Sequence, residues 1–203
     1  MATISDEKLF EQYRRGDAAA LRTIIERYQG DLTRFLYRLV GERAAADDVF
    51  QETFLQVHLS AASFDTSRRF RPWLFTIAAN KGRDYLRKRG RRQTVRLSAP
   101  VAGPAGGGDG SGTTFVDLME IDVPQPSEGV DNQERDQRVQ EALNDMPDSL
   151  REILLLAYFQ RLSYAQIADD LGIPLGTVKS RLHAAVAHFG RRWKALDKDT
   201  EDL

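Results

Sequence analysis

The sequence predicts an all-α protein of two small helical domains, an N-terminal helical bundle and a C-terminal four-helix domain with a helix-turn-helix, joined by a flexible linker. Apolar residues recur at steps of three and four along residues 1–92 and again along 135–196, which is the period of an amphipathic helix. Between these segments, residues 93–134 contain a glycine-rich run that favours neither a helix nor a strand. We therefore expect domains at 1–92 and 135–203, with an acidic linker at 93–134.

The N-terminal domain is expected to begin with a short helix followed by a longer one. Gly16 and Asp17 interrupt the apolar pattern and predict a joint between the two. Gly41 is expected to end the second helix, because glycine readily adopts the left-handed conformation found after helix ends. The apolar stripe that defines these helices comprises Phe10, Tyr13, Leu21, Ile24, Ile25, Tyr28, Leu32, Phe35, Leu36 and Leu39.

The next predicted helix, residues 44–59, combines an apolar stripe with a polar face. Asp48, Gln51 and Glu52 fall three and four positions apart and share that face. Carboxylates so close together raise the question of magnesium, but no histidine, glycine-rich loop or third carboxylate motif accompanies them, and no metal site is expected. A basic protein partner is the functional interpretation of this face, and a solvated helix surface is the alternative.

A cationic, aromatic segment follows. Residues 61–92 hold ten basic and two acidic side chains, although the whole chain has a net charge of −1. Arginines beside aromatic rings suit single-stranded nucleic acid, because bases stack on rings and cations neutralise phosphates. Trp73 is either a core anchor or a base-stacking residue, and Asn80 either contacts a base edge or is simply exposed. Phe70 and Phe75 are expected in the core, and the cations placed on another face include Arg83 and Arg87.

Residues 115–123 alternate loosely and could form a lone strand within the linker. After the linker, two further helices are expected before the helix-turn-helix, with Pro147 in the first turn of the second one. The tail at residues 197–203 carries four acidic side chains and is expected to be disordered.

The helix-turn-helix is predicted at residues 162–182. Ser163 and Gln166 form a capping-box pattern, and Gly172 supplies the turn. In the second helix Val178, Leu182, Ala185 and Phe189 make a buried stripe. Donor-rich residues near its start suit base and phosphate recognition in the major groove, and a plain helical hairpin is the alternative. These candidate DNA-binding residues are Lys179, Ser180, Arg181 and His183.

Several classes of protein are not expected. The chain has no cysteine, which removes disulfides and thiolate nucleophiles and suits a reducing cytoplasm. The N-terminus has no signal-peptide pattern, and no apolar stretch is long enough to span a membrane, so we expect a cytoplasmic protein without membrane insertion. His58, His183 and His188 are scattered, and no nucleophile lies in a recognisable setting. We accordingly expect no catalytic residue, no cofactor and no enzyme activity.

Three segments in this order resemble the extracytoplasmic-function (ECF) subfamily of the sigma-70 family of RNA polymerase sigma factors. Residues 46–54 are similar to the segment that docks on the clamp helices of the polymerase. Residues 72–80 are similar to the promoter-melting segment, and residues 176–182 are similar to the recognition helix for the minus-thirty-five element. The resemblance covers nearly the whole chain except the linker and the acidic tail.

The resemblance implies a role for each candidate residue. It assigns core RNA polymerase binding to Asp48, Gln51 and Glu52. It assigns the minus-ten element to the promoter-melting segment and its surroundings: Asn80 and the loop at about residues 60–69 would capture a flipped base, and Arg83 and Arg87 would hold phosphates nearby. Trp73, which lies in the same segment, is counted among the DNA-binding candidates. Contacts to the minus-thirty-five element fall to Lys179, Ser180, Arg181 and His183.

The expected function is therefore that of a sigma factor that binds core RNA polymerase and directs promoter-specific initiation, and an anti-sigma protein is an expected further partner. The alternative is a helix-turn-helix regulator that binds DNA without polymerase. Such a regulator would need neither an acidic docking helix nor a cationic aromatic helix on a separate domain. An enzyme is a third and weaker alternative, for the reasons given above.

Overall fold

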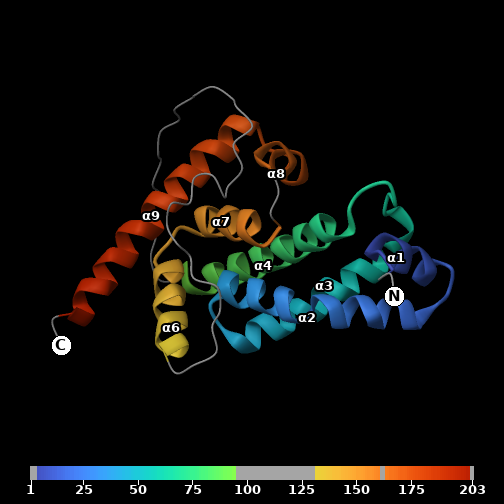
Figure 1. Cartoon of the computed structure of the whole chain (residues 1–203), viewed down its shortest axis with the longest axis horizontal. Helices are drawn as coiled ribbons and strands as arrows, with labels where there is room; N and C mark the ends of the chain where they lie inside the picture. Colours follow the sequence, from blue (N-terminus) through green and yellow to red (C-terminus); the bar gives the residue numbers. More distant parts are fainter. Residues whose placement is uncertain (1–3, 95–130, 161–162, 202–203) are drawn as a thin grey trace. The chain divides into compact units, whose positions relative to one another are not determined.

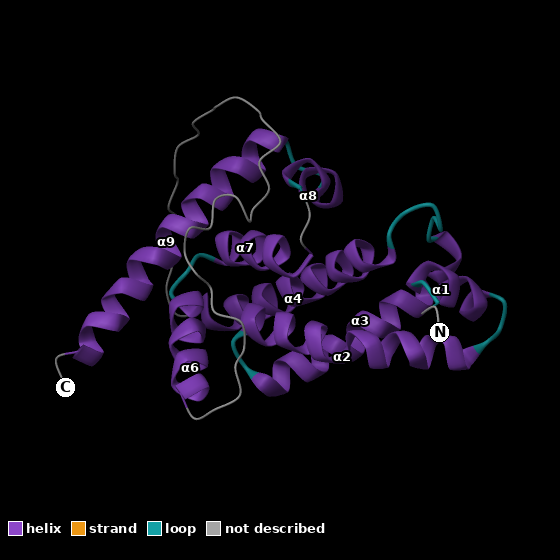
Figure 2. Cartoon of the chain, in the orientation of Figure 1, coloured by secondary structure: helices purple, strands orange, loops and turns teal. Residues whose placement is uncertain are grey.

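The computed structural model describes residues 4–94, 131–160 and 163–201, and these residues form helices joined by loops, with no strand among them (Figure 2). The chain divides into two compact units, Met1–Ser98 and Ala99–Leu203. The prediction of an all-α protein with two helical parts is confirmed.

The N-terminal unit is a bundle of four helices. Helices α2 (Ala18–Val40), α3 (Arg43–Leu59) and α4 (Phe70–Thr94) run side by side, and α1 (Asp6–Arg14) lies at one end of them (Figure 1). A single 3-10 turn, η1 (Ala61–Ser63), follows α3. The end of the bundle occupied by α1 is where α3 finishes and α4 starts, so α1 lies beside the loop between them.

Local residues explain where these helices start and stop. The Asp17 carboxylate accepts a hydrogen bond of 2.9 Å from the Ala19 N–H and caps α2. Gly16 lies at φ +104° and Gly41 at φ +81°, a left-handed region that side chains with a Cβ disfavour. The predicted joint after α1 and the predicted end of α2 are both confirmed.

The core of the N-terminal unit is aromatic and aliphatic. Phe70 and Phe75 are fully buried, as expected. Tyr28 is buried too, and its hydroxyl donates to the Asp6 carboxylate over 2.5 Å. Burial, followed by this hydrogen bond, holds the pKa of Tyr28 well above its usual range, so the phenol stays neutral. The other large side chains with no appreciable exposure are Phe10, Ile24, Leu32, Phe35, Leu36, Leu39 and Leu74.

The C-terminal unit has the four helices expected. They are α6 (Asp131–Asn144), α7 (Asp148–Gln160), α8 (Tyr164–Leu171) and α9 (Leu175–Glu201), and α9 packs against each of the other three (Figure 1). Pro147 was expected inside the first turn of α7, but the helix begins one residue later. The Pro147 carbonyl accepts from the N–H groups of Leu150 and Arg151, both over 3.0 Å, so the proline precedes the helix.

The helices extend past the boundaries expected from composition. α4 continues to Thr94 and α6 starts at Asp131, so both reach into the segment predicted as linker. The rest of that segment, including the possible strand at 115–123, lies outside the described residues. α9 continues to Glu201, so the tail expected to be disordered begins inside a helix. No helix among the described residues is both long and apolar enough to cross a membrane.

Candidate polymerase and nucleic-acid interfaces

The candidate docking residues lie on the solvent side of α3. Asp48, Gln51 and Glu52 are exposed, while the apolar positions between them face the core. Thr53 belongs to that buried side, where its hydroxyl donates to the Val49 carbonyl over 2.7 Å and leaves no polar group unsatisfied. The fold therefore presents the three candidates together on one helix face, as their spacing predicted.

Two leucines extend this face, and sequence reasoning missed them. Leu55 is 59% exposed and Leu59 is 67% exposed, the largest exposures among the large apolar side chains of the described residues. They follow Asp48 by seven and eleven positions, so they continue its side of the helix. His58, near the end of the same helix, is exposed and shares a hydrogen bond with the Tyr13 hydroxyl. Acidic groups next to exposed leucines suit a protein partner better than a solvated surface.

The candidates on α4 share a second face. Trp73, Asn80 and Arg87 are separated by seven residues each, which turns the helix by nearly two full turns and keeps them in line. Asn80 and Arg87 are exposed, and Arg83 is half-buried one step to the side. The line covers about 20 Å along the helix axis, which is long enough to follow several nucleotides.

Trp73 lies in an aromatic cluster at the start of α4. Its ring centroid is 4.5 Å from that of Phe64, 5.5 Å from Phe10 and 5.7 Å from Phe70. It remains partly exposed, unlike those three neighbours, which are buried. The indole thus packs in the cluster while part of it stays accessible, and its helix position lies on the same face as Asn80.

The loop before α4 is built around Asp65. Its carboxylate accepts hydrogen bonds from the Ser67 N–H at 2.9 Å and the Ser67 hydroxyl at 2.8 Å, forming an Asx turn. These two bonds, the backbone one first, lower the pKa of the Asp65 carboxyl. Residues 65–69 are all exposed, while Phe64 is buried at their base. The loop therefore displays polar and cationic side chains from a fixed backbone turn.

The helix-turn-helix has the capping box and the glycine turn that its sequence predicted. The Ser163 hydroxyl accepts from the Gln166 N–H at 3.4 Å, and the Gln166 side chain accepts from the Ser163 N–H at 3.0 Å, so the capping box is present. Gly172 adopts φ +62°, and the next N–H, from Ile173, donates to the Ala168 carbonyl at 3.1 Å. This Schellman arrangement ends α8 and directs the chain into α9.

The candidate DNA-reading residues lie at the start of α9. Val178, Leu182 and Ala185 are buried, as predicted, but Phe189, the fourth residue of the predicted buried stripe, is only half-buried. Of the four candidates, Ser180, Arg181 and His183 are exposed and Lys179 is half-buried. With 3.6 residues per turn, Lys179, Ser180 and His183 share one face, whereas Arg181 flanks the buried stripe.

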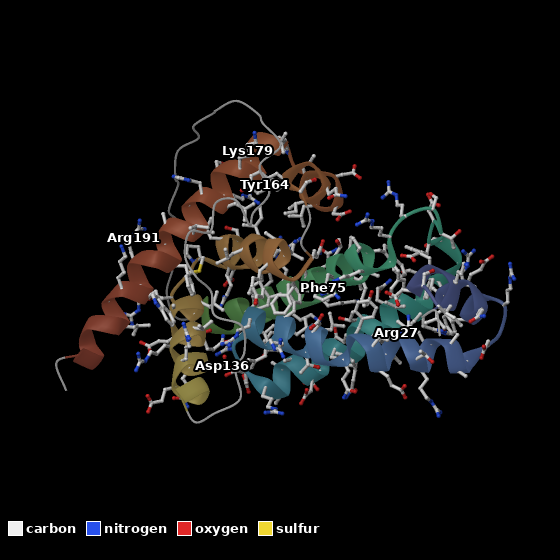
Figure 3. The ribbon with its side chains drawn as sticks, in the orientation of Figure 1. Arg27, Phe75, Asp136, Tyr164, Lys179 and Arg191 are labelled. Carbon is white, nitrogen blue, oxygen red and sulfur yellow. The ribbon has the colours of Figure 1, made fainter. Side chains whose placement is uncertain are left out.

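Further along α9, two adjacent arginines have different surroundings. Arg192 reaches α6, where its guanidinium lies 2.7 Å from the Glu141 carboxylate and 3.9 Å from that of Asp145. Arg191 is exposed and projects outward from the helix (Figure 3). Lys194 is exposed as well, on the side of the helix that carries Lys179 and His183. Arg191 and Lys194 therefore extend the cationic face of α9.

The described residues contain no group of three histidine, cysteine, aspartate or glutamate side chains placed to hold a metal ion. The candidate surfaces on α3, α4 and α9 offer charged groups, hydrogen-bonding groups and an aromatic ring for binding.

Two protein families match the chain. Residues 24–92 match Sigma-70 region 2, and residues 136–189 match Sigma-70 region 4. The first match includes the α3 and α4 faces, and the second includes the helix-turn-helix.

Whole-chain relatives agree with these matches. The ECF RNA polymerase sigma factor SigW of Bacillus subtilis is 32% identical over 197 residues, covering 97% of each chain. The RNA polymerase sigma-H factor of Pseudomonas aeruginosa is 31% identical over 98% of this chain and 95% of its own. Two solved structures share the fold at 23% identity: CnrH in complex with the cytosolic domain of CnrY (TM-score 0.63, covering 94% of this chain and 97% of that chain) and RpoE in complex with the anti-sigma factor NepR from Bartonella quintana (TM-score 0.60, covering 86% and 96%).

The chain belongs to the sigma-70 family of RNA polymerase sigma factors. Within that family it is a member of the ECF subfamily, and its function is to bind core RNA polymerase and direct promoter-specific initiation. A helix-turn-helix regulator acting without polymerase is not favoured, because region 2 is present together with region 4.

Proposed function

We propose that the N-terminal unit carries two interfaces, one for the polymerase on α3 and one for the minus-ten element on α4. The acidic side chains Asp48 and Glu52, with Gln51 between them, form the polar part of the polymerase interface. The exposed Leu55 and Leu59 add an apolar part. The observation that carries this proposal is that an acidic, leucine-bearing face and a cationic, aromatic face occur in one small bundle.

On α4, Trp73 and Asn80 contact unpaired bases and Arg83 and Arg87 contact phosphates of the minus-ten element. Stacking on an indole ring and an amide hydrogen bond suit an exposed base, and the arginines provide charge without sequence preference. In the C-terminal unit, Lys179, Ser180, Arg181 and His183 contact the minus-thirty-five element in the major groove. These contacts position an enzyme made of other chains, and we propose that the factor has no catalysis, cofactor or metal of its own.

The cellular compartment in which this chain acts follows from its partners. Core polymerase and promoter DNA lie in the cytoplasm, so we place the action of this chain there. Two structures of the same fold hold a second protein, the cytosolic domain of CnrY in one and the anti-sigma factor NepR in the other. By analogy, we propose that an anti-sigma protein restrains this chain too.

The decisive experiment is co-elution of the full-length chain with purified core RNA polymerase on size exclusion. The wild type is expected to co-elute, and Asp48→Arg combined with Glu52→Arg is expected to abolish co-elution while the helical circular dichroism is unchanged. Glu26→Arg reverses an exposed acid on α2, away from this face, and serves as the matched control that still co-elutes. A folded double variant that binds like the wild type would remove the α3 assignment.

A further inference from the structure

Helix α1 contacts the loop between α3 and α4 near both ends of that loop. From the end of α1, the Arg14 guanidinium donates to the carbonyl oxygens of Phe64 at 3.1 Å and Ala62 at 3.4 Å. From its start, the Glu7 carboxylate accepts from the backbone N–H of Phe70 at 2.9 Å. The exposed loop residues 65–69 lie between these two attachment points.

The contact with Glu7 compensates for a missing local cap. Phe70 is the first residue of α4, and the residue before it is Arg69, whose side chain has no acceptor for the free N–H groups at a helix start. Glu7, distant in the sequence, supplies that acceptor and places a negative charge at the positive end of the helix dipole. The start of α4 is therefore fixed relative to α1 rather than by its own loop.

Arg14, like Glu7, contacts backbone groups of the loop. A guanidinium presents several N–H donors in a fixed plane, so one side chain can hold two carbonyls of a tight turn at once. The adjacent Arg15 instead pairs with Glu11 of its own helix, at 2.5 Å. Two neighbouring arginines on α1 thus have different roles, one toward the loop and one along the helix.

α1 is itself firmly attached to the rest of the bundle. Asp6 accepts from Tyr28 at 2.5 Å and from Arg27 at 2.8 Å, both on α2 (Arg27 is labelled in Figure 3). Tyr13 shares its hydrogen bond with His58 at the end of α3. Phe10 packs in the aromatic cluster, with its ring centroid 5.3 Å from Phe64 and 4.9 Å from Phe70. A helix held at so many points can hold a loop in place.

We propose that α1 is a positioning element for promoter recognition: Glu7 and Arg14 fix the two ends of the loop at residues 60–69 and thereby set its selectivity for the minus-ten element. The inference rests on the proposed role of that loop and of α4 in contacting minus-ten bases. It adds residues that lie before the segment matching region 2, which starts at residue 24. Neither residue needs to touch DNA, because a loop released at either end must be reordered on binding, and ordering backbone costs free energy.

The test uses holoenzyme formed from core polymerase and the full-length chain. It is incubated with a pool of promoter fragments randomised in both the minus-ten and the minus-thirty-five regions, and the bound fraction is sequenced. Glu7→Ala and Arg14→Ala are each expected to reduce the strongest minus-ten base preference about fivefold, equivalent to about 1 kcal/mol. The minus-thirty-five preferences from the same pool, and the affinity for core polymerase, are expected to be unchanged.

Matched variants separate positioning from general damage. Glu7→Gln keeps an oxygen acceptor for the Phe70 N–H and is expected to retain most of the minus-ten preference. Arg15→Ala removes an arginine one position away and is expected to match the wild type. Thermal unfolding of every variant accompanies the selection, so that a variant that does not fold is identified and Arg14→Lys takes the place of Arg14→Ala.

Each outcome has a defined meaning. Wild-type minus-ten preferences in folded Glu7→Ala and Arg14→Ala would overturn the inference and leave the proposed function intact. Parallel loss of minus-ten preference, minus-thirty-five preference and polymerase binding would also overturn it, because the effect would then be on the fold. A wild-type holoenzyme with no minus-ten preference would overturn the proposed function itself.

Discussion

Gly82 of α4 packs against Leu39 and Val40 at the end of α2. A Cβ added at this position would lie 2.5 Å from Leu39 Cδ2 and 3.7 Å from Val40 Cγ1, and Leu39 is itself buried with little room to move. Gly90, two turns later on the same helix, has nothing within 4 Å of its added Cβ. The two glycines have the same helix-propensity disadvantage and very different surroundings.

This contrast gives a paired prediction on stability. Gly90→Ala is expected to stabilise the N-terminal unit by up to about 1 kcal/mol, through the better helix propensity of alanine. Gly82→Ala is expected to destabilise it, because overpacking costs roughly 1–3 kcal/mol and outweighs the same propensity gain. Urea denaturation monitored by circular dichroism measures both, and a stabilised Gly82→Ala variant would show that Leu39 repacks freely.

The Asx turn at Asp65 gives a prediction on pH. Because the folded-state pKa of Asp65 is lowered, the turn stabilises the fold above the ordinary pKa of an aspartate and loses this contribution as the pH falls through the lowered value. In an NMR titration the Asp65 carboxyl is expected to titrate below the ordinary value of 3.8. Ser67→Ala removes the hydroxyl donor but keeps the backbone N–H, so its midpoint is expected to rise only part of the way. An unchanged midpoint in this variant would leave the backbone bond as the sole cause.

At the scale of one element, Lys179, Arg191 and Lys194 lie on one side of α9, whereas Arg181 lies beside its buried stripe. From Leu175 to Leu196 the helix contains no acidic residue, and its exposed cations begin at the DNA-reading end and continue to Lys194. Arg192 is the exception, since it is paired with Glu141 and Asp145 on α6. Under the proposed function, the exposed Arg191 is available for phosphate contacts beyond the first turns of the helix, whereas the adjacent Arg192 stabilises the fold.

Salt dependence distinguishes these two roles. Arg191→Ala combined with Lys194→Ala is expected to reduce the slope of log K against log salt for a minus-thirty-five duplex by about 2, because each lost phosphate contact removes close to one counterion. Arg192→Ala is expected to leave the slope unchanged and to lower the thermal stability of the C-terminal unit. Fluorescence anisotropy over a salt series measures the slope, and equal slopes for all three proteins would place Arg191 and Lys194 away from the DNA.

Elements whose ends depend on local residues were predictable from sequence. Gly41, Gly172 and the Ser163 capping box act within a few residues, and the structure confirms all three. The start of α4 was not predictable in this way, since its acceptor comes from Glu7, 63 positions away. The end of α9 was missed because its acidic tail suggested disorder, whereas the helix continues to Glu201.

At the scale of the whole molecule, the proposal of two domains predicts independent opening. Ser163→Ala removes the capping box of α8 and is expected to destabilise the C-terminal unit by about 1 kcal/mol. Amides of α7 and α9 that exchange by opening of this unit should then exchange about fivefold faster, while those of residues 4–94 keep their wild-type rates. Hydrogen exchange read by mass spectrometry gives both values in one experiment. Faster exchange in both units would show that they unfold together.

The candidate surfaces were predictable in part. Spacing alone grouped Asp48, Gln51 and Glu52, because charge and helix period are both written in the sequence. Leu55 and Leu59 were not recognised, since an exposed leucine has the same spacing as a buried one until its neighbours are known. The partial exposure of Trp73 likewise depends on rings contributed by α1 and by the loop.

The ion pair between Arg192 and Glu141 restricts rotation of α9 about its own axis. α9 is one continuous helix, so its two ends cannot turn about the axis independently. Arg192 follows Lys179 by 13 residues, about 20 Å along that axis. The contact of Arg192 with α6 therefore helps to set the direction in which Lys179, Ser180 and His183 point, and these are the residues that we propose contact the major groove. If the residue of α9 that pairs with Glu141 were one position earlier or later, all three side chains would rotate by about 100° about the helix axis.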